Sequence, residues 1–263
     1  MNRDKQTGDE QSLRFYATPP RPCTYLENRS AISVFADPDV TLSPAIYEKL
    51  APLGFRRSGK DLYIPACANC NQCIPARVMV ETFQRTRSQQ RVWQRNRDVS
   101  CSALDARFEQ EHFELYCRYL SQRHPGGGME NPSPDDYLNF MTSNWSDTLF
   151  LEFRHNGSLL GVAVTDCLPD ALSSVYTFFD PEFSRHSPGT LAILTQIETA
   201  RELGLSWLYL GYWVSGCRKM TYKNRFRPLQ VFRDGNWQHF DPGKNYDTPP
   251  QADDSAPPPI SAG

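Results

Sequence analysis

The 263-residue chain has no uninterrupted apolar run of the roughly 18 residues that a membrane-spanning helix needs. Its first residues, MNRDKQTGDEQSLRFY, also lack the apolar stretch of a secretory signal peptide. We therefore expect no membrane association and a cytoplasmic location. Because disulfides are rare in that compartment, the 8 cysteines indicate metal binding, catalysis or plain burial.

Histidine is also scarce, with 5 in the chain, and no nucleophile, histidine and acid are spaced as an obvious catalytic set. Net charge is only −2, yet basic residues are concentrated in two segments. Residues 56–97 contain nine Lys or Arg and two acids, and residues 217–233 contain six and no acid. Such segments predict a surface for a polyanion, with solvated helix faces as the alternative.

Composition divides the chain into four parts. We predict a loose N-terminus at residues 1–12 and, because residues 243–263 are rich in Pro and Asp, a disordered tail there. A cysteine-bearing N-terminal region at 13–98 and a second region at 99–242 lie between them. In the first region, Ser43 followed by proline predicts the start of a short helix.

The second region predicts two helices, three antiparallel strands, a long helix, a strand, a short helix and a hairpin. Turns are indicated at Asn156-Gly157 and Asp234-Gly235, and the long helix should end before Gly204. A helix between two apolar strands predicts a parallel pair with a right-handed crossover. We therefore predict an α+β fold, a GNAT-like acyltransferase domain whose mixed central sheet has two splayed strands.

Three cysteines, Cys67, Cys70 and Cys73, form the run CANCNQC. A two-residue spacing lets successive thiolates reach one ion. Cys23 is our candidate for a fourth ligand, because it lies in the same region and no histidine lies near the run. Four thiolates suit zinc or an iron–sulfur cluster equally well. Reduced, half-buried cysteines and a redox sensor are the alternatives.

Two further segments combine aromatic and charged residues. Tyr176, Phe178 and Asp180 alternate along one predicted strand, where Asp180 could cap the next loop or handle a proton. Residues 209–228 interleave aromatic and basic side chains, which suits the unpaired end of an RNA. The alternative is a core strand followed by a basic surface helix.

Long strings of the sequence carry a family resemblance. They are RFYATPPRPCTYL, GFRRSGKDLYIPACANCNQCIPARV, RHPGGGM, SSVYTFFDP, SPGTLAILTQIETARELGL and LYLGYWVSGCRKMTYKNRFRP. In this order, from Leu13 to Phe240, the chain resembles the bacterial aspartate/glutamate leucyltransferases, which are related to the eukaryotic arginyl-tRNA–protein transferases. The resemblance implies transfer of leucine from leucyl-tRNA to proteins with N-terminal Asp or Glu, which marks them for degradation in the N-degron pathway.

That reaction implies roles for individual residues. The acceptor's α-amine, with a pKa near ~8, needs positioning, a modest base and help for an oxyanion, so the chemistry requires no cofactor. The candidate catalytic residues are Tyr176, Asp180 and Tyr212. The candidate reader of the acceptor's carboxylate is Arg77, with Arg56 and Arg57 as alternatives. The candidates for the tRNA end are Lys219, Tyr222, Lys223 and Arg225, and those for its stem are Arg87, Arg91 and Arg95, which share one helical face.

Three other functions stay open. Arginine could replace leucine as the donor, the protein could be a GNAT-type acetyl-CoA N-acetyltransferase, or it could be a non-catalytic RNA- or zinc-binding module. Enzymes of the second kind usually have a glycine-rich turn that binds pyrophosphate before the central helix. Here the turn DPEFSRHSPGT has a single glycine, Gly189, which favours a donor other than CoA. The sequence leaves the oligomeric state open.

Overall fold

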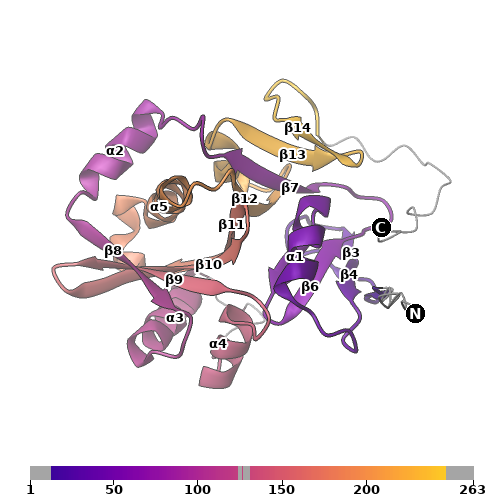
Figure 1. The fold of residues 1–263 in the computed structure, drawn as a ribbon, viewed down its shortest axis with the longest axis horizontal. Coiled ribbons are helices and arrows are strands. Elements are labelled where there is room, and N and C mark those ends of the chain that lie inside the picture. Colours follow the sequence, from indigo (N-terminus) through magenta and orange to yellow (C-terminus); the bar gives the residue numbers. More distant parts are fainter. Residues whose placement is uncertain (1–12, 124–125, 127–130, 247–263) are drawn as a thin grey trace, which may run out of the picture.

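A computed structural model describes residues 13–123, 126 and 131–246 (Figure 1). The predicted loose N-terminus at 1–12, most of the segment RHPGGGM and nearly all of the predicted tail at 243–263 lie outside these residues. None of the described helices is long and apolar enough to cross a membrane.

The N-terminal part contains a small antiparallel sheet of strand order β1-β4-β6-β5. Its strands are β1 (Phe15–Ala17), β4 (Ser33–Ala36), β5 (Arg56–Ser58) and β6 (Asp61–Pro65), and β2 (Arg21–Pro22) pairs separately with β3 (Ser30–Ala31). As predicted, Ser43 begins helix α1 (Pro44–Leu50), because its side chain accepts the Ile46 N–H. The short helix η1 (Ala51–Leu53) then leads to β5.

The larger sheet has eight strands in the order β14-β13-β7-β12-β11-β10-β9-β8. They are β7 (Cys73–Met79), β8 (Val99–Asp105), β9 (Thr148–His155), β10 (Ser158–Leu168), β11 (Ala171–Phe179), β12 (Trp207–Val214), β13 (Leu229–Arg233) and β14 (Asn236–His239). Among these strands, β11 and β12 form the one parallel pair. The hairpin turns at Asn156-Gly157 and Asp234-Gly235 are confirmed by positive φ at all four residues.

Sheet pairing does not follow the domain boundary predicted at residue 98. Strand β7, from the cysteine-bearing region, lies between β12 and β13 in the larger sheet. The sequence of β7, CIPARVM, does not alternate regularly between apolar and polar residues, so it did not indicate a strand. The described parts therefore share one sheet.

The two central strands splay apart as predicted. Residues Ala171–Ser173 of β11 pair with Trp207–Tyr209 of β12, but the pairing stops there although both strands continue. Helix α5 (Pro188–Glu202) makes the crossover between them. This mixed sheet with a V-shaped opening confirms the predicted α+β, GNAT-like fold.

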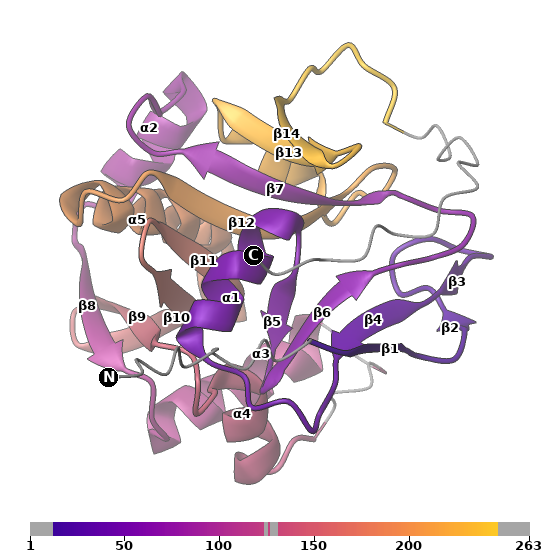
Figure 2. The same ribbon diagram turned by 45° about the vertical axis from the view of Figure 1, so that its right-hand side comes forward.

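Helices cover both faces of the larger sheet (Figure 1). Phe150 of β9 packs with α3 (Gln110–Arg123) and α4 (Pro134–Met141), whereas the next residue, Leu151, packs with α5. Helix α2 (Arg87–Arg95) lies beside α5. Helix α1 and strands β5 and β6 lie against the central strands (Figure 2). Two further short helices are η2 (Pro181–His186) and η3 (Thr221–Arg225).

Candidate active site

A bulge in β12 lies where the central strands separate. Leu210 and Gly211 have no paired residue in β7, and Gly211 has φ +72°, which glycine adopts without strain. The extra residue shifts the alternation of side chains. Tyr209 and Tyr212 therefore both contact the N-terminal part. A glycine inside an apolar strand was the available signal for this bulge.

The hydroxyl of Tyr212, a predicted catalytic residue, is already engaged in hydrogen bonds to the backbone. Its hydroxyl donates to the carbonyl oxygens of Gly54 at 2.9 Å and Tyr63 at 3.1 Å. Burial raises the pKa of Tyr212 well above its ordinary value. We therefore revise its role from catalysis to positioning, because it ties β12 to β6 and to the residue at the end of η1.

The other two predicted catalytic side chains are also engaged elsewhere. Tyr176 packs edge-on against Tyr116 and Phe140, and burial raises its pKa, which opposes a role as a base. Asp180 accepts the backbone N–H of Glu182 and caps η2. Capping was the alternative that the sequence left open for Asp180.

Arg57 is withdrawn as a candidate for acceptor binding, because it forms a fully buried ion pair. Its Nε and Nη2 donate to the two carboxylate oxygens of Asp166 at 2.7 and 2.8 Å, and both side chains are 0% exposed. Asp166 also accepts from Thr148 at 2.7 Å, and Arg57 donates to the Gly59 carbonyl. The pair thus joins β5 to β10.

Arg77 lies between two indole rings. Its guanidinium carbon is 3.5 Å from the ring centre of Trp207 and 4.2 Å from that of Trp237. Its Nε and Nη2 donate to Gln230 Oε1 at 3.0 and 2.8 Å. Because Gln230 already accepts hydrogen bonds from this edge of the guanidinium, Arg77 is a weaker candidate for binding the carboxylate of an acceptor protein than the sequence predicted.

Arg56 has a different environment. It is 4% exposed, and its guanidinium lies 4.5 Å from the ring centre of Tyr209. Its Nη1 donates to the carbonyl oxygens of Ala51 and Phe55. Among the described residues, Nε and Nη2 have no hydrogen-bond partner. Arg56 is therefore the strongest candidate of the three arginines for binding the carboxylate of an acceptor protein.

Lys223 was predicted to hold the tRNA end, but it is buried. It is 9% exposed, and its Nζ donates to the Tyr212 carbonyl at 2.8 Å. Burial, with a smaller contribution from the charge of Arg56, lowers the pKa of Lys223 to about 8. The charge of Lys223 therefore lies inside the molecule and not on its basic surface. The neighbouring candidates Lys219, Tyr222 and Arg225 are exposed.

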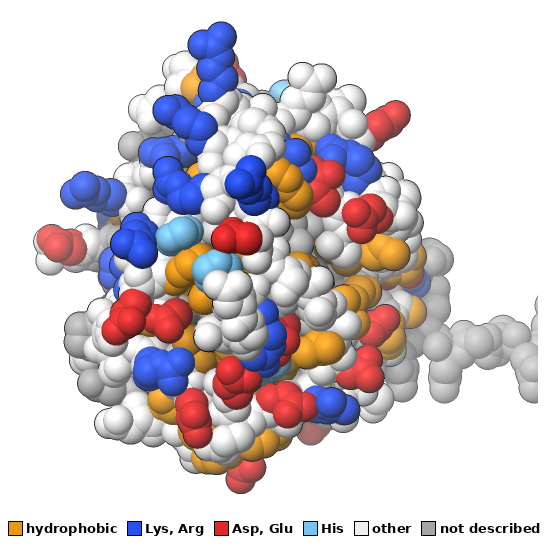
Figure 3. Space-filling view, turned by 90° about the vertical axis from the view of Figure 1, so that its left-hand side faces the viewer, with side chains coloured by type: hydrophobic (Ala, Val, Ile, Leu, Met, Phe, Trp, Pro, Cys, Tyr) orange, Lys and Arg blue, Asp and Glu red, His pale blue; other side chains and the backbone are white. Residues whose placement is uncertain are grey.

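The predicted stem-binding arginines Arg87, Arg91 and Arg95 are exposed on α2. Arg95 also donates to the Arg185 carbonyl, which places η2 beside the end of α2. Figure 3 shows one face of the molecule. Most Lys and Arg side chains of this face lie in its upper half, at the height of α2, and most Asp and Glu side chains lie in its lower half. Gln89 of α2 donates to the Arg225 carbonyl, so the two predicted RNA-binding segments are adjacent.

Four cysteines line one cavity of about 190 Å³, together with Tyr63 and Tyr212. They are Cys23, Cys67, Cys70 and Cys73. Burial and the neighbouring cysteines raise the pKa of Cys73 to about 12. Within the described residues, no three His, Cys, Asp or Glu side chains are arranged to coordinate a metal ion. The four cysteines thus share one cavity, but in this arrangement they do not form a coordination set.

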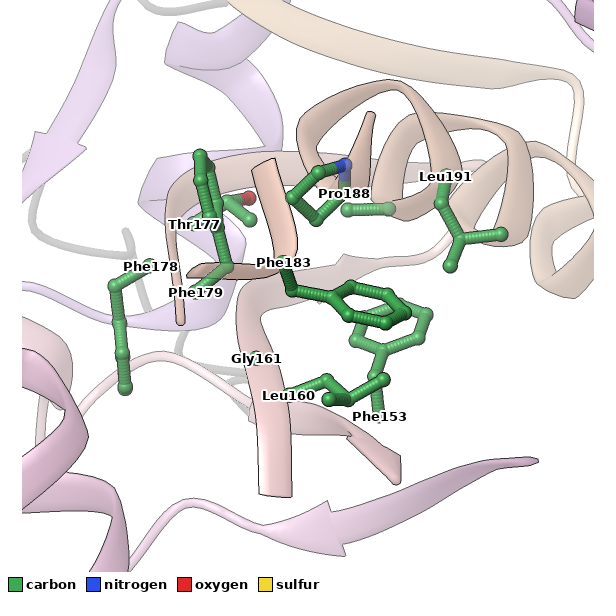
Figure 4. Close-up of a pocket in the computed structure, with 10 residues that line it drawn as sticks. Phe153, Leu160, Gly161, Thr177, Phe178, Phe179, Phe183, Pro188 and Leu191 are labelled. Carbon is green, nitrogen blue, oxygen red and sulfur yellow. The ribbon is translucent and has the colours of Figure 1, made fainter. Parts of the chain in front are cut away.

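The start of α5 differs from a pyrophosphate-binding site. Pro188 has no N–H, and the N–H groups of Thr190 and Leu191 donate to the Ser187 carbonyl. Phe183 and Leu191 help to line a pocket here that has about 10 Å³ of free space (Figure 4). An apolar space of that size holds at most one water. The prediction that the donor is not CoA is consistent with this geometry.

Two sequence profiles of one family match the chain. They are described as "Arginine-tRNA-protein transferase, C terminus", which matches residues 111–233, and "Arginine-tRNA-protein transferase, N terminus", which matches residues 21–91. The class of protein is therefore an aminoacyl-tRNA–protein transferase.

Curated relatives narrow the class. The chain is 50% identical to the aspartate/glutamate leucyltransferase of Hahella chejuensis, over 86% of this chain and 97% of that protein. It is 48% identical to that of Alcanivorax borkumensis, over 88% and 95%. The chain belongs to the aspartate/glutamate leucyltransferase family. Among solved structures, FemX is similar with a TM-score of 0.49 and 12% identity, over 76% of this chain and 69% of that one.

Proposed function

We propose that this protein transfers leucine from leucyl-tRNA to the N-terminal Asp or Glu of acceptor proteins in the cytoplasm, and so marks them for degradation. The observation that carries the proposal is 50% identity to a leucyltransferase over 86% of this chain and 97% of that protein. The aminoacyl end of the tRNA is proposed to bind where β11 and β12 separate.

In the reaction, the acceptor's α-amine attacks the ester carbonyl carbon of the charged tRNA. A new C–N bond forms, the C–O bond to the terminal ribose breaks, and the proton lost by the amine replaces the acyl group on the ribose oxygen. An α-amine with a pKa near ~8 is partly neutral at pH 7, so positioning and charge stabilisation carry most of the work. The unpaired backbone at Leu210 and Gly211 is our candidate for contact with the oxyanion.

The exposed arginines of α2 are proposed to bind the tRNA stem through phosphate contacts. Lys219, Tyr222 and Arg225 are proposed to hold the unpaired end, because their segment is joined to α2 by the Gln89–Arg225 hydrogen bond. The reaction itself needs no cofactor. Cys23, Cys67, Cys70 and Cys73 are proposed to hold zinc or an iron–sulfur cluster, which would fix β7 and the wall formed by Tyr63 and Tyr212.

The test is transfer of radiolabelled leucine from purified leucyl-tRNA to peptides that start with Asp, Glu or Ala. We expect label on the first two peptides and not on the third, with arginyl-tRNA and acetyl-CoA as parallel donors. Label only from arginyl-tRNA would replace leucine by arginine as the donor. Binding of tRNA without label on any peptide would contradict an enzymatic function.

A further inference from the structure

Arg56 and Lys223 are two buried cations without an acidic partner among the described residues. Neither Arg56 nor Lys223 takes part in any of the salt bridges formed by the described residues. The two lie close enough for the charge of Arg56 to lower the pKa of Lys223. Because buried charges are ordinarily paired, two adjacent unpaired cations indicate that an anion from outside the chain completes the site.

The free edge of Arg56 indicates what kind of anion. Nε and Nη2 of a guanidinium are parallel donors that together bind the two oxygens of a carboxylate. The next residue provides an internal example, because Arg57 uses these same atoms to bind Asp166 at 2.7 and 2.8 Å. Arg56 has the same edge, buried and without a partner in the described chain.

Lys223 adds a second charge and further donors. Its Nζ carries three hydrogens, and the hydrogen bond to the Tyr212 carbonyl uses one. A Cβ placed on Gly211 would lie 3.6 Å from Nζ. Nζ therefore lies beside the bulge, at the point where the pairing of the central strands ends.

We propose that Arg56 and Lys223 bind the side-chain carboxylate of the acceptor's N-terminal Asp or Glu. This assignment rests on the proposed function. Arg56 would bind both carboxylate oxygens through Nε and Nη2, and Lys223 would donate to one of them. A terminal phosphate of the tRNA could bind the same edge, but it is the less favoured occupant because the exposed cations of α2 are already proposed to bind the phosphates of the tRNA.

The site explains why an amide would be rejected. Asn or Gln at the acceptor's N-terminus would bring an NH₂ group toward donors that cannot accept a hydrogen bond. Sites built to pair with a particular polar group discriminate strongly against an analogue that leaves their own groups unpaired. We expect the discrimination between Asp and Asn to depend on Arg56 and Lys223 together.

The experiment compares kcat/KM for leucine transfer to two peptides that differ only in an N-terminal Asp or Asn. The variants are Arg56→Met, Arg56→Lys and Lys223→Met, with Lys49→Met, an exposed residue of α1, as the matched control. We expect the Asp/Asn ratio to fall at least about 30-fold in the two Met variants. Arg56→Lys should restore part of it, and the dissociation constant for leucyl-tRNA should change less than about 3-fold.

Each alternative role has its own signature. An unchanged Asp/Asn ratio in both Met variants overturns the proposal. A general-base role for Lys223 would lower kcat for both peptides equally, and a phosphate site would weaken leucyl-tRNA binding instead; both results would also overturn it. Binding of a fluorescent Asp peptide without tRNA separates the two proposals. Wild-type protein that binds this peptide better than its Asn counterpart but transfers no leucine would refute the proposed function and leave the carboxylate site standing.

Discussion

Removal of the charge on Lys223 should stabilise the free protein at neutral pH. Its pKa is about 8 in the fold and 10.5 ordinarily, a difference of about 2.5 that corresponds to roughly 3 kcal/mol against the folded state. Lys223→Met removes this penalty, and it also removes the hydrogen bond to Tyr212, which contributes about 1 kcal/mol. The expected net gain is about 2 kcal/mol at pH 7, or roughly 5 °C in Tm.

The gain has a definite dependence on pH. Below pH 8 the lysine is protonated in both the folded and the unfolded chain, so the full penalty applies. Between the folded pKa of about 8 and the unfolded value of 10.5, the unfolded chain binds more protons, and the wild type therefore gains stability as pH rises. At pH 9.5 about 1.4 kcal/mol of the penalty remains, so the advantage of the variant should fall below about 0.5 kcal/mol.

Urea denaturation followed by tryptophan fluorescence, at pH 7 and pH 9.5, measures both quantities. Other titrating groups are common to the two proteins and cancel in the difference. The control Lys49→Met, an exposed lysine, should stay within about 0.5 kcal/mol of the wild type at both pH values. A variant less stable than the wild type at pH 7, or a gain that is the same at both pH values, would refute the assignment of Lys223 as an unpaired buried cation.

Three further predictions concern other parts of the molecule. Asp166→Asn should lower the free energy of unfolding by about 3–5 kcal/mol, because it leaves the Arg57 charge buried without its partner; a loss below about 1 kcal/mol in urea denaturation would contradict this. Replacing all three exposed arginines of α2 with Gln should reduce the slope of log affinity for leucyl-tRNA against log salt by about 2–3, whereas Arg118→Gln on α3 should leave the slope unchanged. Elemental analysis of the purified protein should find zinc or iron that is lost in Cys70→Ser; equal metal content in both proteins would exclude the cysteines as its ligands.

Local features of the chain were predictable from sequence because the groups that decide them are neighbours. Ser43 caps α1 through the Ile46 N–H three residues away, and Asn156-Gly157 turns between adjacent strands. Helix α5 ends at Glu202, close to Gly204, whose φ is +71°. The long family strings were equally accessible, because they depend on residue order alone.

The candidate site was predicted only in outline. The sequence indicated that Arg56, Arg57 and Arg77 are arginines suited to a carboxylate, but not what each of them contacts. The partner of Arg57 lies 109 residues away, and that of Arg77 lies 153 residues away. Neither separation leaves a trace in local spacing, so the sequence placed Arg77 first and could not show that Arg57 and Arg77 already have partners.

By itself the sequence determined the family, the available cations and most of the helices and strands of the second region, but not strands β7 and β8. The tertiary structure decided which of those cations are already paired. Pairing and burial depend on contacts between distant segments, such as β5 against β10 and η3 against β12. Those contacts leave Arg56 and Lys223 buried together while Arg57 keeps its own carboxylate. The same side-chain chemistry thus becomes a structural link at one residue and a candidate acceptor site at the next.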